Sequence, residues 1–219
     1  MKTKTRVVVI GGQKGGTGKS TLAQNLAVAC ALEGGDVMLI DTDTPQNTSN
    51  KWQLERGEAK LGLALHSSIH KGRGVGDAID DYKKRYSHIV VDTGGADSDE
   101  LRVALIRADV LVTPFQPNQA DMWTVEKMNK LVADARVVNP KLRAIAVVSN
   151  APGNPRVGEP ASAAVYLEDF EELTLAQAIV RNRMTYPRAL AQGRGALEYE
   201  PVDEKAREEI NTLYAEVFK

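Results

Sequence analysis

An internal disulfide, an iron–sulfur cluster and a membrane span are the first features that this sequence excludes, because it contains a single cysteine and no long apolar run. Cys30 has no second cysteine with which to form an internal disulfide, and one thiol cannot hold an iron–sulfur cluster. The basic N-terminal residues precede a run of only four apolar residues, Val7 to Ile10, which is too short for a signal peptide. Because no stretch approaches the roughly 18 apolar residues of a membrane span, we expect a cytoplasmic protein.

A strong charge of one sign is also missing. The 28 Lys and Arg residues balance 29 Asp and Glu residues, and the formal net charge is -1. Nucleic-acid binding would therefore need a local cluster of basic residues. The three histidines, His66, His70 and His88, do not have the spacing of a metal site. At 219 residues the chain is long enough to bury a large core, and we expect a single domain over residues 1–219.

What is present is a glycine-rich loop, residues 11–21, between a predicted strand over Val7 to Ile10 and a predicted helix over Ser20 to Glu33. Its glycines permit backbone conformations in which successive N–H groups point at phosphate oxygens. In such a loop Lys19 reaches the β- and γ-phosphates and Ser20 binds Mg²⁺. A glycine-rich turn with a surface lysine is the alternative, which the flanking strand and helix disfavour. We therefore expect a nucleotide cradle formed by Gly15, Gly16, Thr17, Gly18, Lys19, Ser20 and Thr21.

Two further predicted strands end in acidic residues. Val37 to Ile40 is followed by Asp41 and Asp43, and His88 to Val91 is followed by Asp92. Open α/β sheets bind ligands at the carboxyl ends of their strands. Asp92 matches a Walker B acid, which binds Mg²⁺ through water. Asp41 and Asp43 are either a turn-forming pair or ligands for Mg²⁺ and the attacking water, and the loop upstream favours the second interpretation.

A second lysine makes the loop unusual. Lys14 either contacts solvent or reaches the triphosphate of a facing subunit, while Gln13 occupies the position at which the general P-loop has its first glycine. The pattern Lys-Gly-Gly-x-Gly-Lys-Ser resembles the deviant Walker A motif of the ParA/MinD ATPases. In that family the first lysine contacts nucleotide across a sandwich dimer. The resemblance therefore implies an ATP-dependent homodimer in which Lys14 is catalytic together with Lys19.

The resemblance also implies roles for residues further along the chain. It assigns Asp41 to the magnesium ion with Ser20 and Asp92, and Asp43 to the catalytic role of positioning water. Thr44 is inserted before Pro45 and Gln46, where the family continues directly after the second acid. Asn150 falls where the family often contacts the adenine ring, although Asn after a strand is also a common turn residue.

The predicted fold is an α/β, three-layer P-loop NTPase fold with a mostly parallel twisted sheet flanked by helices. Further strands are predicted over Leu61 to His66, Val110 to Phe115 and Leu142 to Ser149. Further helices are predicted over Asp77 to Tyr86, up to Arg107, over Ala120 to Val138 and over Val202 to Phe218. Asp97 or Asp99 is expected at the start of the helix that ends at Arg107.

Basic residues gather near the C-terminus without acidic neighbours. The segment from Ile179 to Leu197 contains four arginines and no acidic residue before Glu198. Such a run is usually a solvated surface, but the small ParA proteins use basic residues here to bind nonspecific DNA. The resemblance therefore implies DNA contacts by Arg181, Arg183 and Arg188. The last predicted helix carries several glutamates, which disfavours binding to a membrane.

Together these features predict a ParA-like ATPase with ATP and Mg²⁺ as cofactors, nucleoid-associated in the cytoplasm. It would dimerise with ATP, bind nonspecific DNA and hydrolyse ATP when stimulated by a ParB-like centromere-binding protein or a cargo adaptor. Plasmid partition is the expected role. The alternatives are a MinD-like or cargo-positioning regulator, for a chemoreceptor cluster or a carboxysome, and less favoured, a P-loop metabolic enzyme or a module that binds ATP without hydrolysing it.

Overall fold

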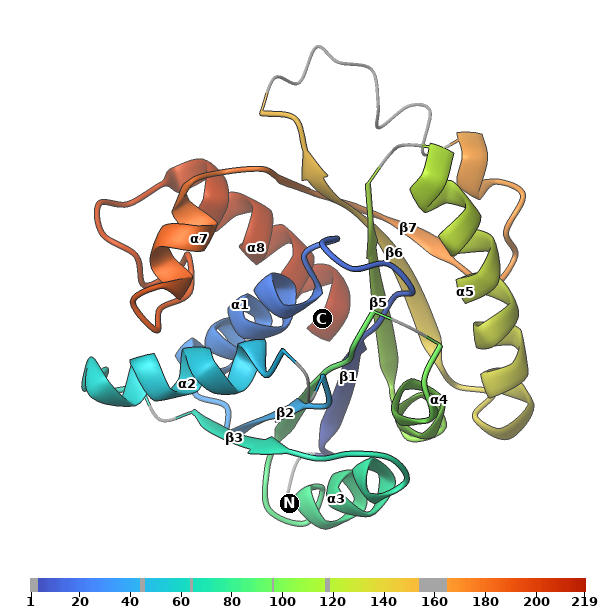
Figure 1. Cartoon of the computed structure of the whole chain (residues 1–219), viewed down its shortest axis with the longest axis horizontal. Coiled ribbons are helices and arrows are strands. Elements are labelled where there is room, and N and C mark those ends of the chain that lie inside the picture. Colours follow the sequence, from blue (N-terminus) through green and yellow to red (C-terminus); the bar gives the residue numbers. More distant parts are fainter. Residues whose placement is uncertain (1–3, 44–45, 64, 96, 117–118, 154–164) are drawn as a thin grey trace.

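A single parallel sheet forms the centre of the computed structural model, which describes residues 4–43, 46–63, 65–95, 97–116, 119–153 and 165–219 (Figure 1). Its seven strands lie in the order β3-β2-β4-β1-β5-β6-β7, and every neighbouring pair is parallel. The strands are β1 (Arg6–Ile10), β2 (Val37–Asp41), β3 (His66–Ile69), β4 (His88–Asp92), β5 (Val110–Phe115), β6 (Arg143–Ala151) and β7 (Thr174–Arg181). The predicted three-layer P-loop NTPase fold is confirmed.

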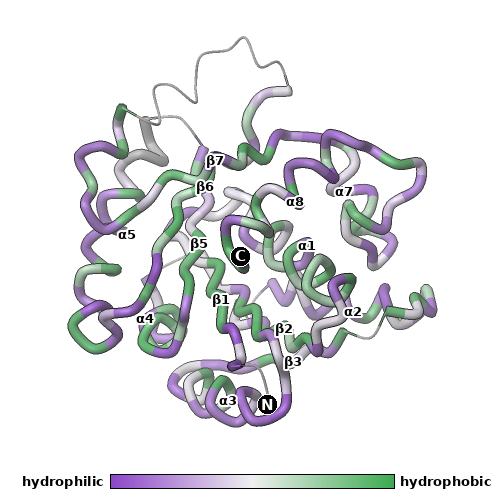
Figure 2. Tube along the Cα trace, turned by 180° about the vertical axis from the view of Figure 1, so that it is seen from behind, coloured by the Kyte–Doolittle hydropathy of each residue, from purple (hydrophilic) through white to green (hydrophobic). Residues whose placement is uncertain are grey.

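Helices cover both faces of the sheet. The helices are α1 (Lys19–Leu32), α2 (Thr48–Glu58), α3 (Gly74–Tyr82), α4 (Asp99–Leu105), α5 (Gln119–Val138), α7 (Thr185–Leu190) and α8 (Glu204–Phe218). One core contains Val8 and Ile10 of β1 with α1 and α8, and the other contains Val7 and Val9 with α3, α4 and α5. Because both faces are buried, the central strands are continuous apolar runs, which Figure 2 shows along β1 and β5.

The register of the strands brings the predicted acids to one edge of the sheet. Asp92 of β4 pairs with Ile10 of β1 on one side and with Asp41 of β2 on the other. The glycine-rich loop leaves β1 at this same edge and leads into α1. Three strands therefore end side by side at residues 10, 41 and 92, which are far apart in the sequence. Open α/β sheets bind their ligands at this edge.

Several predicted boundaries were wrong. β3 is His66–Ile69 and not residues 61–66, because an edge strand has one neighbour and needs no continuous apolar run. α3 begins at Gly74 and ends at Tyr82, earlier than predicted at both ends. Asp99 is an acid of the first turn of α4, as predicted, but the cap is Ser98, whose side chain accepts from the Leu101 N–H, while Asp97 forms an ion pair with Arg102. The helix α2 and the strand β7 were not predicted.

None of the helices in the described ranges combines the length and the apolar character needed to cross a bilayer.

Candidate nucleotide site

The glycine-rich loop folds tightly between β1 and α1. Gly16 has φ 77° and Gly18 has φ 93°, both in the left-handed region that favours glycine. Gly18 is also the N-cap of α1, and a Cβ added to it would lie 2.8 Å from Oγ of Ser149. Glycine at position 18 is therefore required both by its backbone conformation and by the close approach of β6. The N-terminus of α1 faces the loop, which favours an anion there.

A cleft of about 490 Å³ opens beside this loop at the carboxyl edge of the sheet. Its volume lies within the roughly 300–1,000 Å³ of small-molecule sites. It is lined by Gly15, Gly16, Gly18, Lys19, Ser20, Thr21, Asp43, Gln46, Thr48, Thr93, Gly95 and Asn150. The structure thus brings the predicted phosphate cradle, Asp43 and Asn150 around one space. Thr17 is not part of this lining, because it is buried and its hydroxyl lies 3.4 Å from the Lys14 carbonyl oxygen.

The two lysines of the loop are in direct contact. Nζ of Lys19 donates to the carbonyl oxygen of Lys14 at 2.8 Å, and Lys19 is only 8% exposed. Burial lowers the pKa of Lys19, and the negative charges of Asp92 and Asp43 oppose that shift. The ammonium is therefore held inside the loop, facing two of the predicted catalytic and metal-binding acids. The backbone of Lys14 belongs to the same cradle, and its side chain is half-buried.

Asp41 and Asp92 are both buried at the ends of their strands. Asp41 accepts hydrogen bonds at 3.0 Å from the backbone N–H groups of Asp43 and Asn50, and burial raises its pKa. Asp92 accepts a 2.6 Å hydrogen bond from the Ser49 hydroxyl on Oδ2. Burial raises the pKa of Asp92 to about 7, although the hydroxyl groups of Ser49 and Ser20 favour the carboxylate.

The chemistry of this corner fits a magnesium ion held together with a nucleotide. Oδ1 of Asp92 is buried and has no hydrogen-bond partner in the described part of the chain, a costly state that a cation would relieve. Ser20 and Asp41 supply further oxygen donors. Mg²⁺ prefers oxygen ligands and is usually held by one or two carboxylates together with substrate phosphates. The described residues contain no group of three or more His, Cys, Asp or Glu residues that could hold a metal ion.

The segment after β4 passes directly over the loop. A Cβ added to Gly95 would lie 3.1 Å from the backbone nitrogen of Gly15, and one added to Gly94 would lie 3.6 Å from Cγ of Asp43. This segment therefore contacts both the phosphate cradle and the acid predicted to position water. Thr44, the inserted residue after Asp43, lies outside the described residues.

Asn150 closes the cleft from the end of β6. Its φ is 52°, and its side-chain Nδ2 donates to the carbonyl oxygen of Gly16 at 2.9 Å. The amide is therefore engaged with the loop itself, and the adenine contact stays a prediction.

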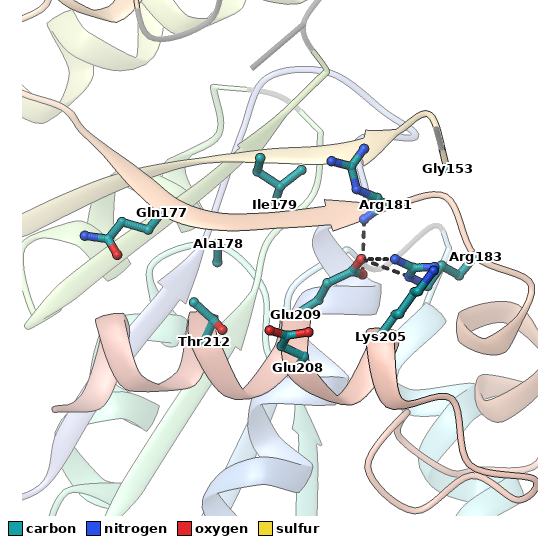
Figure 3. A pocket seen from close by; sticks show the side chains of 10 residues that line it. All are labelled: Gly153, Gln177, Ala178, Ile179, Arg181, Arg183, Lys205, Glu208, Glu209 and Thr212. Atoms are coloured by element: carbon teal, nitrogen blue, oxygen red, sulfur yellow. Dashed lines mark hydrogen bonds and ion pairs between the residues drawn. The ribbon is translucent and has the colours of Figure 1, made fainter. Parts of the chain in front are cut away.

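The predicted DNA-binding arginines lie outside the cleft, and they differ in what they contact. In Figure 3, which shows a second pocket between β7 and α8, Arg183 points at Glu209. Two nitrogens of its guanidinium donate to Oε1 of Glu209 at 2.9 and 2.6 Å, and its side chain is 18% exposed. Arg181 donates to the carbonyl oxygen of Pro152 at 2.7 Å. Arg188, in the last turn of α7, is exposed.

Four polar residues of the site were missed at the sequence level: Gln24, Gln46, Thr48 and Ser49. Gln46 and Thr48 line the cleft, while Ser49 and Gln24 are fully buried behind Asp92. The cluster Asn47-Thr48-Ser49 shortly after a proline is typical of a helix N-terminus. That signal could have placed α2 next to the strand-end acids.

Comparison with known proteins agrees with this geometry. The family described as ATPase MipZ matches residues 6–136. The carboxysome distribution maintenance protein A of Gloeobacter kilaueensis is 40% identical over 123 residues, covering 53% of this chain and 52% of that protein, so the match spans about half of each. The protein of the same name from Halothiobacillus neapolitanus is 26% identical over 220 residues, covering 98% of this chain and 97% of its own.

Solved structures show the same fold. The septum site-determining protein MinD of Pyrococcus horikoshii, complexed with Mg-ADP, superposes with a TM-score of 0.69 at 19% identity, covering 98% of this chain and 96% of that one. The likeness covers the whole sheet and its flanking helices, and not the glycine-rich loop alone.

Proposed function

The chain belongs to the ATPase MipZ family and is an ATP hydrolase of the ParA/MinD type that uses ATP and Mg²⁺, and we propose that ATP makes it dimerise, bind nonspecific DNA and position a cargo. The observation that carries the proposal is Lys14, a second lysine in a loop whose phosphate-binding lysine is already Lys19. In the structure the two belong to one cradle, joined by a 2.8 Å hydrogen bond. In the proposed dimer this lysine would contact the nucleotide bound by the facing copy.

In the proposed reaction the residues of the cleft and the buried acids behind it have separate tasks. The loop N–H groups and Lys19 bind the phosphates, and Ser20, Asp41 and Asp92 hold Mg²⁺. Bound Mg²⁺ would neutralise charge on the phosphate oxygens. Asp43, half-buried in the cleft, orients the water that attacks the γ-phosphate. Hydrolysis is then slow in the isolated protein and stimulated by a partner.

A structural connection supports coupling between the nucleotide and the arginines. The N-terminal turn of α2 holds Asp41 and Asp92, while its later turns hold the segment that follows α7. Nε1 of Trp52 donates to the Arg194 carbonyl oxygen at 3.2 Å. Arg56 is 3% exposed, donates to the Gly193 carbonyl oxygen at 3.0 Å and pairs with both carboxylate oxygens of Glu198 at 2.7 and 2.8 Å. One helix therefore contacts both the strand-end acids of the nucleotide site and the segment that follows α7.

We propose Arg188 as the principal DNA contact, because it is exposed on α7, with Arg181 and Arg183 beside it. A monomer would bind weakly with so few basic residues. An ATP-bound dimer doubles the surface and raises the effective concentration of the second half. Since phosphate contacts release counterions, affinity should fall steeply with salt and depend little on the DNA sequence.

The experiment is a salt titration of binding to two unrelated duplexes, by fluorescence anisotropy, with ATP and with ADP. Tight binding that does not depend on the DNA sequence is expected with ATP and not with ADP. Arg188→Ala should weaken it and reduce the salt slope by about one for each phosphate that the variant no longer neutralises. Arg73→Ala is the matched control, since Arg73 is exposed at the start of α3, on the other face of the sheet. Equal affinity with both nucleotides, or no binding with either, would remove DNA as the partner.

Two cargoes are candidates. Plasmid partition, with a ParB-like partner, is supported by the basic segment from Ile179 to Leu197. Carboxysome positioning, through a cargo adaptor, is favoured by the two relatives that are named for maintenance of carboxysome distribution. In either case the protein would be nucleoid-associated. Deleting the gene and imaging both cargoes separates the two, because plasmid loss supports partition and clustered carboxysomes support positioning.

A further inference from the structure

The first turn of α2 holds both acids predicted to bind magnesium. Asp41 and Asp92 are direct partners across β2 and β4. Two consecutive residues of α2 reach them, since the Asn50 backbone N–H donates to Oδ2 of Asp41 at 3.0 Å and the Ser49 hydroxyl donates to Oδ2 of Asp92 at 2.6 Å. This helix follows β2 directly, after the segment that carries Asp43.

A third buried residue supports the direction of the Ser49 hydrogen bond. Nε2 of Gln24, on α1, donates to Oγ of Ser49 at 3.2 Å. An amide nitrogen is only a donor, so the Ser49 oxygen accepts from Gln24 and its single proton goes to Asp92. Gln24 and Ser49 are both 0% exposed, and water does not compete for either bond.

One oxygen of Asp92 is therefore occupied and the other is not. Oδ2 accepts from Ser49, while Oδ1 is buried and without a partner in the described chain. Ser20, the predicted magnesium ligand of the loop, lies close to the same carboxylate. We infer that Ser49, supported by Gln24, is a positioning residue that orients the Asp92 carboxylate and leaves Oδ1 available to the Mg²⁺ of bound nucleotide. The inference rests on the proposed role of Asp92 as a magnesium residue.

A positioning role differs measurably from a merely structural one. Outer hydrogen bonds to metal-binding residues commonly change metal affinity by about 10–100-fold. Loss of the Ser49 hydroxyl should therefore weaken nucleotide binding when Mg²⁺ is present and leave it unchanged in EDTA. A structural role would weaken both equally.

The test measures the affinity of a fluorescent ADP analogue in Mg²⁺ and in EDTA, together with the Mg²⁺ dependence of ATP hydrolysis. Ser49→Ala should weaken binding in Mg²⁺ about tenfold, with no change in EDTA, and should raise the Mg²⁺ concentration for half-maximal hydrolysis. Gln24→Leu should give a smaller shift of the same kind and serves if Ser49→Ala does not fold. Ser68→Ala, a serine on β3 that contacts Met38, is the control and should match wild type.

Three outcomes overturn the inference or its premise. Wild-type Mg²⁺ dependence in both Ser49→Ala and Gln24→Leu refutes the role of Ser49. An equal loss in Mg²⁺ and in EDTA refutes it too, because the residue would then be structural. Asp92→Asn separates the two levels: if it keeps wild-type Mg²⁺ dependence, the proposed role of Asp92 fails, and if it loses that dependence while Ser49→Ala keeps it, only the inference about Ser49 fails.

Discussion

Replacing Gly193 by alanine tests how tightly the segment after α7 is joined to α2. Gly193 has φ 65°, a left-handed conformation that costs an L-residue about 1–2 kcal/mol. Its added Cβ would lie 2.2 Å from the backbone nitrogen of Arg56 and 2.3 Å from its Cα. Neither atom belongs to a flexible side chain, so the two backbones must separate by about 1 Å to restore ordinary contact.

That separation would break interactions on both sides of the contact. The hydrogen bond from Arg56 to the Gly193 carbonyl oxygen involves a charged donor and contributes about 1.5–3 kcal/mol, and the bond from Trp52 to Arg194 contributes about 1 kcal/mol. With the conformational strain, Gly193→Ala should lower the free energy of unfolding by about 3.5–6 kcal/mol, a large part of the roughly 5–15 kcal/mol of a typical domain.

The assay is urea denaturation followed by circular dichroism, with Gly72→Ala as the matched control. Gly72 has φ 58°, close to that of Gly193, but no atom lies within 4 Å of its added Cβ. The control should therefore lose only the strain of about 1–2 kcal/mol. If the two variants lose the same stability, the close packing of residue 193 on α2 does not constrain the fold. The connection between α2 and the segment after α7 then fails as well.

Three further predictions concern the nucleotide site and its acids. Asp43→Ala should bind ATP but hydrolyse it at least about 100-fold more slowly, as expected for loss of a group that positions water; hydrolysis at the wild-type rate would move the role to Asp41. Folding raises the pKa of Asp92 from 3.8 to about 7, so the folded state retains a proton that the unfolded state has lost, and stability falls as pH rises between those values. In metal-free buffer, Asp92→Asn should therefore be more stable than wild type at about pH 8, by up to about 4 kcal/mol, with the difference closing toward pH 4; parallel stability curves would contradict this. Added Mg²⁺ and ADP should stabilise the wild type more than Asp92→Asn in thermal melts, and equal shifts would argue against a magnesium role for Asp92.

Local signals were enough to predict the parts of the site that lie on central strands. The loop ending Gly18-Lys19-Ser20 and Asp92 after an apolar run can be recognised without tertiary information, because buried parallel strands are continuous apolar runs. The bounds of β3 and β7 could not be recognised in this way, because edge strands bury less of their surface and need no continuous apolar run. β7 shows alternating burial and β3 is mostly polar.

The helix α2 was missed for a different reason. Its buried polar residues are stabilised by partners that are distant in the sequence. Ser49 binds Asp92 over a separation of 43 residues, and Arg56 pairs with Glu198 over 142. The cluster Asn47-Thr48-Ser49 indicates where a helix begins, but a local pattern contains no information about such distant partners, so the burial of these polar side chains could not be predicted. The same limit applies to Arg183, whose pairing with Glu209 on α8 is visible only in the folded chain.

ATP is expected to join two copies of this chain through the loop that carries Lys14. Light scattering of the 23.8 kDa protein with Mg²⁺ and a non-hydrolysable ATP analogue, and separately with ADP, measures this directly. We predict that the mass doubles with the ATP analogue and stays that of a monomer with ADP, and that Lys14→Ala still binds the analogue but remains monomeric. A monomer with both nucleotides, or a Lys14→Ala variant that dimerises like wild type, would contradict the account.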